Sequence, residues 1–100
     1  MSTDVQALLQ RDHHSLGRAA GDYVRAMDAS EILKHLDAAA TKALYSGDGA
    51  AAWVIRGVIN GPNAYGEYLR DAAAVLLRDK PEYLKHFGTD FTKGVAGRLN

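Results

Sequence analysis

Two kinds of residue group in this sequence carry side chains that can do chemistry. The first is the stretch RDHHS, residues 11–15, which holds an acid, two imidazoles and a hydroxyl. Nucleophilic catalysis needs Ser, His and Asp brought together in space, whereas adjacent residues on a helix point in different directions. Asp12 also falls within an apolar helical stripe. A polar site would explain this, but we favour a bend between two shorter helices.

The second group is a pair of matched acid–imidazole spacings, Glu31 with His35 and Glu82 with His86. Residues at i and i+4 project from one helix face and can share a metal ion, but each pair supplies only two ligands and the chain has no cysteine. The helical wheel places each pair on the water-facing side, near a helix start. We therefore expect surface contacts and no metal, no cofactor and no catalytic residues. The sequence also lacks HExxH, Walker and glycine-rich phosphate motifs.

These two pairs belong to a longer repetition. EILKHLD (31–37) is echoed by EYLKHFG (82–88), and upstream GDYVR (21–25) is echoed by GEYLR (66–70). The blocks keep their order, with six extra residues between them in the second copy. Such periods often mark repeated supersecondary units, so one hypothesis is an internal duplication of about 16–47 and 61–97. Chance is the alternative, because Ala, Leu, Lys and capping residues recur in any helical protein.

Composition limits the class of protein. One hundred residues predict a single domain, 1–100, and twelve basic residues balance twelve acidic ones. A generic nucleic-acid binder shows a basic excess, and a DNA mimic shows an acidic one. The first residues lack the apolar stretch of a signal peptide, and the apolar run 72–77 is far too short to span a membrane. These features predict a cytoplasmic protein.

The pattern of apolar residues predicts an all-α fold: a compact bundle of five or six short helices. Helix starts are expected at Thr3 or Asp4, at Asp28 with Glu31 as its capping-box partner, at Asp48, and near Asp79. The third helix is expected over about 49–60 and the fourth over about 64–78, separated by the turn signal NGPN. Helical periodicity assigns these residues to the core: Ile32, Leu33, Leu36, Ala40 and Leu44 in the second helix; Val54, Ile55, Val58 and Ile59 in the third; Tyr65, Tyr68, Leu69, Ala72 and Leu76 in the fourth.

The third helix has an unusual outer surface. If Val54 and Ile55 face inward, Trp53 points the other way, beside Arg56, Gly57 and Asn60. Trp and Arg are the residue types most often found at interface hot spots. Trp53, Arg56, Gly57 and Asn60 are therefore candidate partner-binding residues. The alternative is that this helix is wrapped on all sides, which would make Trp53 part of the core.

We expect the chain to be a non-catalytic module that binds another protein. In its whole-chain character, including GAAAWVIRGVINGPNAYGEYL (49–69), it resembles small proteins of phages and mobile elements, among them the anti-CRISPR inhibitors. That resemblance implies an inhibitor that docks on a Cas protein or surveillance complex. The near-neutral charge favours steric or allosteric block over DNA mimicry.

Two other functions remain open at this stage. The first is a helix-turn-helix regulator, in which residues 64–78 would enter the major groove. Its exposed face would be Glu67, Arg70, Asp71 and Arg78, with Ala74 at the centre, and this mixed charge is a poor match for phosphate. A metal-dependent enzyme or sensor is the third and least favoured possibility.

Overall fold

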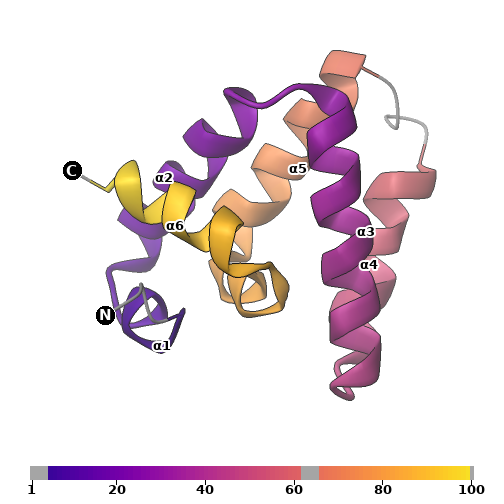
Figure 1. Ribbon diagram of the computed structural model, residues 1–100, viewed down its shortest axis with the longest axis horizontal. Coiled ribbons are helices and arrows are strands. Elements are labelled where there is room, and N and C mark those ends of the chain that lie inside the picture. Colours follow the sequence, from indigo (N-terminus) through magenta and orange to yellow (C-terminus); the bar gives the residue numbers. More distant parts are fainter. Residues whose placement is uncertain (1–4, 62–65, 100) are drawn as a thin grey trace.

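The computed structural model describes residues 5–61 and 66–99, and within these ranges every regular element is a helix (Figure 1). The predicted all-α class is confirmed. The described residues form six α-helices and one 3₁₀ helix. These are α1 (Val5–Leu9), α2 (His13–Arg25), α3 (Ala29–Tyr45), α4 (Gly49–Asn60), α5 (Gly66–Asp79), η1 (Pro81–His86) and α6 (Thr89–Gly97).

Three aspartates set the starts of the first long helices. The carboxylates of Asp12, Asp28 and Asp48 accept the backbone N–H three residues on, at 3.1, 3.0 and 3.2 Å. Each satisfies a donor that the first turn of a helix leaves without an intrahelical partner. The predicted starts at Asp28 and Asp48 and the predicted bend at Asp12 are confirmed. Thr3 and Asp4 lie outside the described residues.

The helices are arranged around α5. Figure 1 shows α5 between α2 on one side and the α3–α4 pair on the other. Helix α3 packs chiefly on α4, and α2 packs chiefly on α5. The short elements α1, η1 and α6 close the remaining side of α2. One apolar core joins them, centred on Leu16, Ile32, Leu77 and Phe91, none of which is more than 1% exposed.

Helices α2 and α5 approach closely because small residues face each other. A Cβ placed on Gly17 would overlap the backbone carbonyl of Arg78, and one on Gly21 would lie 3.6 Å from the carbonyl oxygen of Ala74. This contact turns Ala73, Ala74 and Leu77 of α5 inward. The expectation that Ala74 is the centre of an exposed face is therefore wrong, since Ala74 is 1% exposed.

Several predicted core positions on α3, α4 and α5 are also wrong. Tyr68 is 68% exposed, because α5 turns its alanines to α2 and leaves Tyr68 outside. Leu33, Leu44 and Val54 are also exposed rather than buried. On α3 the core positions are Ile32, Leu36, Ala39, Ala40 and Ala43, so the alanines face the neighbouring helices and two leucines do not. Tyr65 lies outside the described residues.

The repeated sequence blocks have different structures. Asp28 caps the 17-residue helix α3 through its side chain, whereas Asp79 is the last residue of α5. Helix η1 starts after Lys80, which makes no side-chain capping hydrogen bond. A helix does begin near Asp79, as predicted, but it begins at Pro81 and Asp79 does not cap it. Internal duplication stays a hypothesis about the origin of the chain.

The close approach of α2 and α5 gives a stability prediction. Gly17→Ala should destabilise the protein by about 1–3 kcal/mol, because the added methyl overpacks a backbone contact. Gly57→Ala is the matched control, since a Cβ there has nothing within 4 Å. That change should stabilise the protein by about 0.5–1 kcal/mol, the usual gain for Gly to Ala inside a helix. Urea unfolding followed by circular dichroism measures both, and equal effects would contradict the close contact.

Candidate functional site

Trp53 is a surface residue of α4. It is 81% exposed, and Gly57 and Asn60, which follow at helical spacing on the same side, are also exposed. The wrapped-helix alternative is therefore wrong for Trp53. The inward side of α4 is formed by Ala51, Ala52 and Ile55, which pack on α3 and the core. This places three of the four candidate partner-binding residues together on the solvent side of one helix.

Arg56, the fourth candidate, lies at the edge of this surface and contacts α3. Its guanidinium donates hydrogen bonds to the carboxylate of Asp37 and, at 3.1 Å, to the hydroxyl of Thr41. The pair with Asp37 is also a salt bridge between two partly exposed side chains. Arg56 therefore helps to join α3 to α4. Its contact with a partner stays a prediction.

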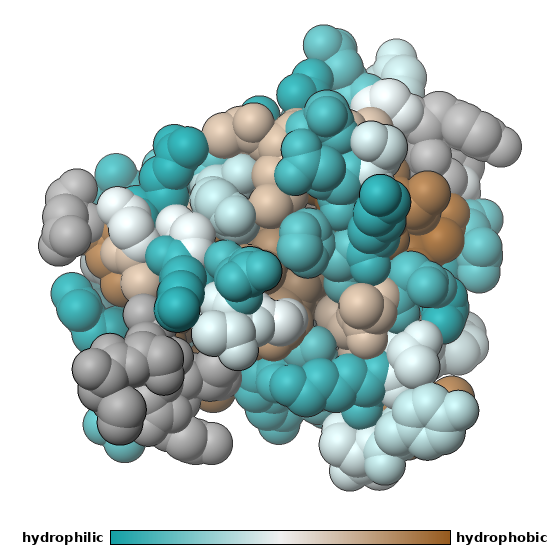
Figure 2. All heavy atoms as spheres, in the orientation of Figure 1, coloured by the Kyte–Doolittle hydropathy of each residue, from teal (hydrophilic) through white to brown (hydrophobic). Residues whose placement is uncertain are grey.

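The outward side of α4 carries no other charge. Arg56 is the one charged residue between Gly49 and Asn60, whereas α2, α3 and α5 each expose acidic and basic side chains. The solvated character of the rest of the protein is visible in Figure 2, where hydrophilic residues cover most of the face and hydrophobic ones lie between them. Charged residues are depleted at the centre of protein interfaces, and α4 shares this feature.

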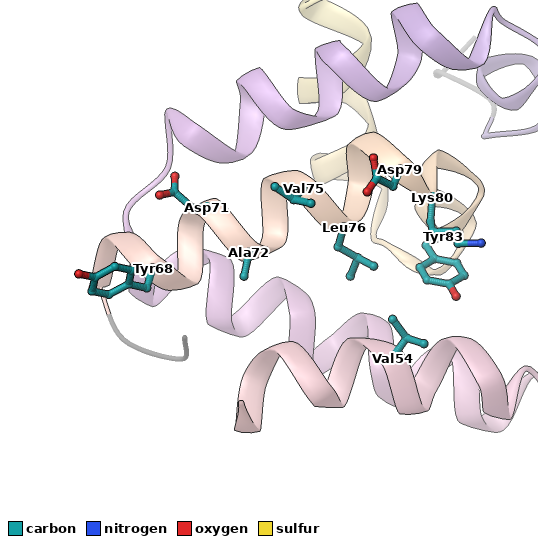
Figure 3. A pocket seen from close by; sticks show the side chains of 9 residues that line it. All are labelled: Val54, Tyr68, Asp71, Ala72, Val75, Leu76, Asp79, Lys80 and Tyr83. Carbon is teal, nitrogen blue, oxygen red and sulfur yellow. The ribbon is translucent and has the colours of Figure 1, made fainter. Parts of the chain in front are cut away.

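An apolar groove lies beside this surface, between α4 and α5. Because α4 packs chiefly on α3 and α5 chiefly on α2, the two helices leave a space of about 610 Å³. We call it the α4–α5 groove. It is lined by Val54, Tyr68, Asp71, Ala72, Val75, Leu76, Asp79, Lys80 and Tyr83 (Figure 3). Sequence reasoning missed this groove because Tyr68 and Val54 were assigned to the core.

The two histidines of the repeated blocks, His35 and His86, each contact a side chain from another part of the fold. His86 is 5% exposed, and its Nε2 donates to the Oδ2 of Asp48 at 2.8 Å. The prediction that His86 faces water is wrong. Its hydrogen-bond partner Asp48 is 38 residues away, so the spacing of residues within one helix could not indicate this contact. His35 is half-buried, with its ring 5.1 Å from that of Phe91. The contact between His86 and Asp48 fixes η1 to the start of α4.

Hydrogen bonding stabilises the ionised form of the capping carboxylates. The bond from His86, followed by that from the Ala51 N–H, lowers the pKa of Asp48 below its ordinary 3.8. The N–H groups of Ser15 and Glu31 are the chief causes of the lowered pKa values of Asp12 and Asp28. The Ser15 hydroxyl also donates to Asp12 at 3.0 Å. Asp12 and Ser15 of the RDHHS stretch therefore form the N-terminal cap of α2.

The described residues hold no group of three or more His, Asp or Glu side chains placed to share a metal ion. None of the described helices has both the length and the apolar character needed to cross a bilayer.

The lowered pKa of Asp48 predicts a pH effect on stability. Since the folded-state pKa lies below the unfolded one, the contribution is present above pH 3.8 and is lost as pH falls through the folded value. Asp48→Asn keeps a capping oxygen for Ala51 but has no ionised form. We expect this variant to lose less stability than the parent between about pH 5 and pH 2.

Thermal unfolding at a series of pH values checks this. His86→Ala should flatten the same part of the profile, because it removes the largest cause of the lowered pKa. Asp22→Asn, at an exposed position of α2, reports what the loss of any surface carboxylate does. A parent-like pH slope in Asp48→Asn would contradict the role of this contact.

Comparison with known proteins adds no relative to these observations. No family model matches the chain, and no match was found among curated proteins or solved structures.

Proposed function

We propose that this chain is a non-catalytic protein-binding module that docks on another protein through the outward side of α4. The observation that carries the proposal is the exposure of Trp53, 81% in a folded domain. Trp is usually buried for most of its surface. A partner that covers the indole removes a large apolar area from water at a small cost in side-chain entropy, because Trp has only two χ angles.

Gly57 supports the same surface. It lies inside α4, one turn after Trp53, and a Cβ there would meet nothing within 4 Å. Glycine inside a helix is less stable than alanine by about 1 kcal/mol, and no contact within the described residues requires it. A partner whose backbone approaches α4 closely would make use of the missing side chain. Asn60, at the end of the helix, supplies an amide for hydrogen bonds at the rim.

The partner we propose is a host defence complex, inhibited in the manner of the anti-CRISPR proteins that the sequence resembles. The zero net charge and the uncharged side of α4 support steric or allosteric block, because a DNA mimic needs a continuous acidic surface. A DNA-binding role has less support. The exposed charged residues of α5 are Glu67, Asp71, Arg78 and Asp79, and this acidic excess would repel phosphate.

Trp53→Ala tests the proposal. With the protein as bait in extracts of its native host, or of a host that carries defence systems, the specific partner should be captured by the parent and lost with the variant. Against the purified partner, Kd should rise at least roughly thirtyfold, or about 2 kcal/mol, as for a central Trp. Stability should change by no more than about 0.5 kcal/mol, because Trp53 is on the surface.

Leu33→Ala is the matched control, since it removes an exposed apolar side chain of α3. It should leave both capture and Kd unchanged. Unchanged affinity in Trp53→Ala would contradict the proposed docking surface. A large drop in the unfolding free energy of Trp53→Ala would instead show that the indole supports the fold.

A further inference from the structure

The α4–α5 groove has apolar walls and charge along one edge. Ala72 and Leu76 of α5 point toward Val54 of α4, and Tyr68 and Tyr83 lie at the two ends (Figure 3). Asp71 and Asp79 project from the edge of α5 that faces away from Val54. Lys80 lies at the end of the groove near Tyr83 (Figure 3). An occupant therefore meets apolar side chains along the bottom of the groove, two carboxylates along one side and one ammonium group at the Tyr83 end.

We propose that the groove accepts an amphipathic α-helix of the partner, with one apolar face and basic residues along one edge of that face. The inference rests on the proposed function and identifies the element of the partner that contacts this protein. Trp53 and the groove would then be adjoining parts of one docking surface, joined through the consecutive residues Trp53 and Val54 of α4.

The shape of the groove fits a helix. Its lining residues on α5 recur every three or four positions from Tyr68 to Asp79, over about three turns or 16 Å. Val75 is 39% exposed and Val54 is 37% exposed, so apolar surface is left uncovered on both walls. A third helix lying along this stripe would bury it by packing its side-chain ridge into the groove, with anchors at i, i+4 and i+7.

The charges select a basic edge. Asp71 and Asp79 lie about two turns, or 12 Å, apart along α5. Their side chains are 66% and 65% exposed, and the cations beside them, Arg25 and Arg78, are at 3.6 and 4.0 Å, beyond hydrogen-bond distance. Both carboxylates therefore have acceptor capacity for Lys or Arg on an incoming helix. An acidic edge would place like charges together.

The test uses three synthetic peptides, each about four turns long and held helical by a side-chain staple. The first has leucines at i, i+4 and i+7 with lysines along one edge, the second replaces the lysines with glutamates, and the third replaces the leucines with serines. Titration into ¹⁵N-labelled protein should shift the amides of α5, η1 and the Val54 region with the lysine peptide. The glutamate peptide should bind about tenfold more weakly, with a difference that shrinks in high salt, and the serine peptide should not bind.

Substitutions then place the peptide. Val75→Asn should weaken the lysine peptide about tenfold, since it puts an uncharged polar group among the apolar contacts. Ala38→Asn, at an exposed position of α3, is the matched control and should have no effect. An Asp71→Asn, Asp79→Asn variant should lose the preference for the lysine peptide, because Arg25, Arg78 and Lys80 remain beside the groove.

Three results would overturn the inference: no saturable binding of the lysine peptide, amide shifts outside the groove, or the same amides shifting on dilution of the protein alone. The last would identify a second copy as the occupant. Capture of the natural partner separates the two proposals. If Trp53→Ala abolishes capture and Val75→Asn does not, the docking function stands and the helix in the groove is wrong. If the lysine peptide binds and Trp53→Ala leaves capture intact, the α4 surface is wrong.

Discussion

Asp48 joins three parts of the chain with one side chain and its backbone. Its N–H donates to the carbonyl of Ala43 at 2.9 Å, which closes the turn after α3. One carboxylate oxygen caps α4 at Ala51, and the other accepts the hydrogen bond of the buried His86. Because α4 carries Trp53 and Val54 while η1 carries Tyr83, this contact fixes one wall of the groove relative to the end at which Tyr83 lies.

The turn before Asp48 makes this geometry reachable. Gly47 has φ 88°, a left-handed conformation that glycine adopts without the steric penalty of a Cβ. It reverses the chain within a few residues, so that α4 returns along α3 with its alanines inward. Arg56 then holds the two helices together further along, through Asp37 and Thr41. The hairpin is thus fixed at its turn by Asp48 and near its middle by Arg56.

Local signals in the sequence were enough to predict where α3 and α4 begin. Asp28 and Asp48 stand directly before the helices they cap, and the predicted range 49–60 agrees with α4. What faces the core depended on partners that the sequence does not display. The side of α5 that faces inward depends on the close contact with Gly17 and Gly21 of α2. The buried His86 depends on Asp48 for its hydrogen bond. Trp53 could be singled out because Ile55 and other apolar residues of the same helix were expected to face inward, which left Trp53 outside, although Val54 is itself exposed. The groove arises only when α4 and α5 pack on different neighbours.

The contact between α2 and α5, which we call the α2–α5 seam, also affects the order in which the chain folds. The α3–α4 hairpin joins neighbours in sequence, so its contacts require only a short loop to close. The contact of Gly17 with Arg78 closes most of the chain, and it loses more conformational entropy before it gains any packing. From this difference we expect the α3–α4 hairpin to form first and α2 to dock on α5 later. Substitutions at the seam would then act mainly on the unfolding rate, and those in the hairpin on the folding rate.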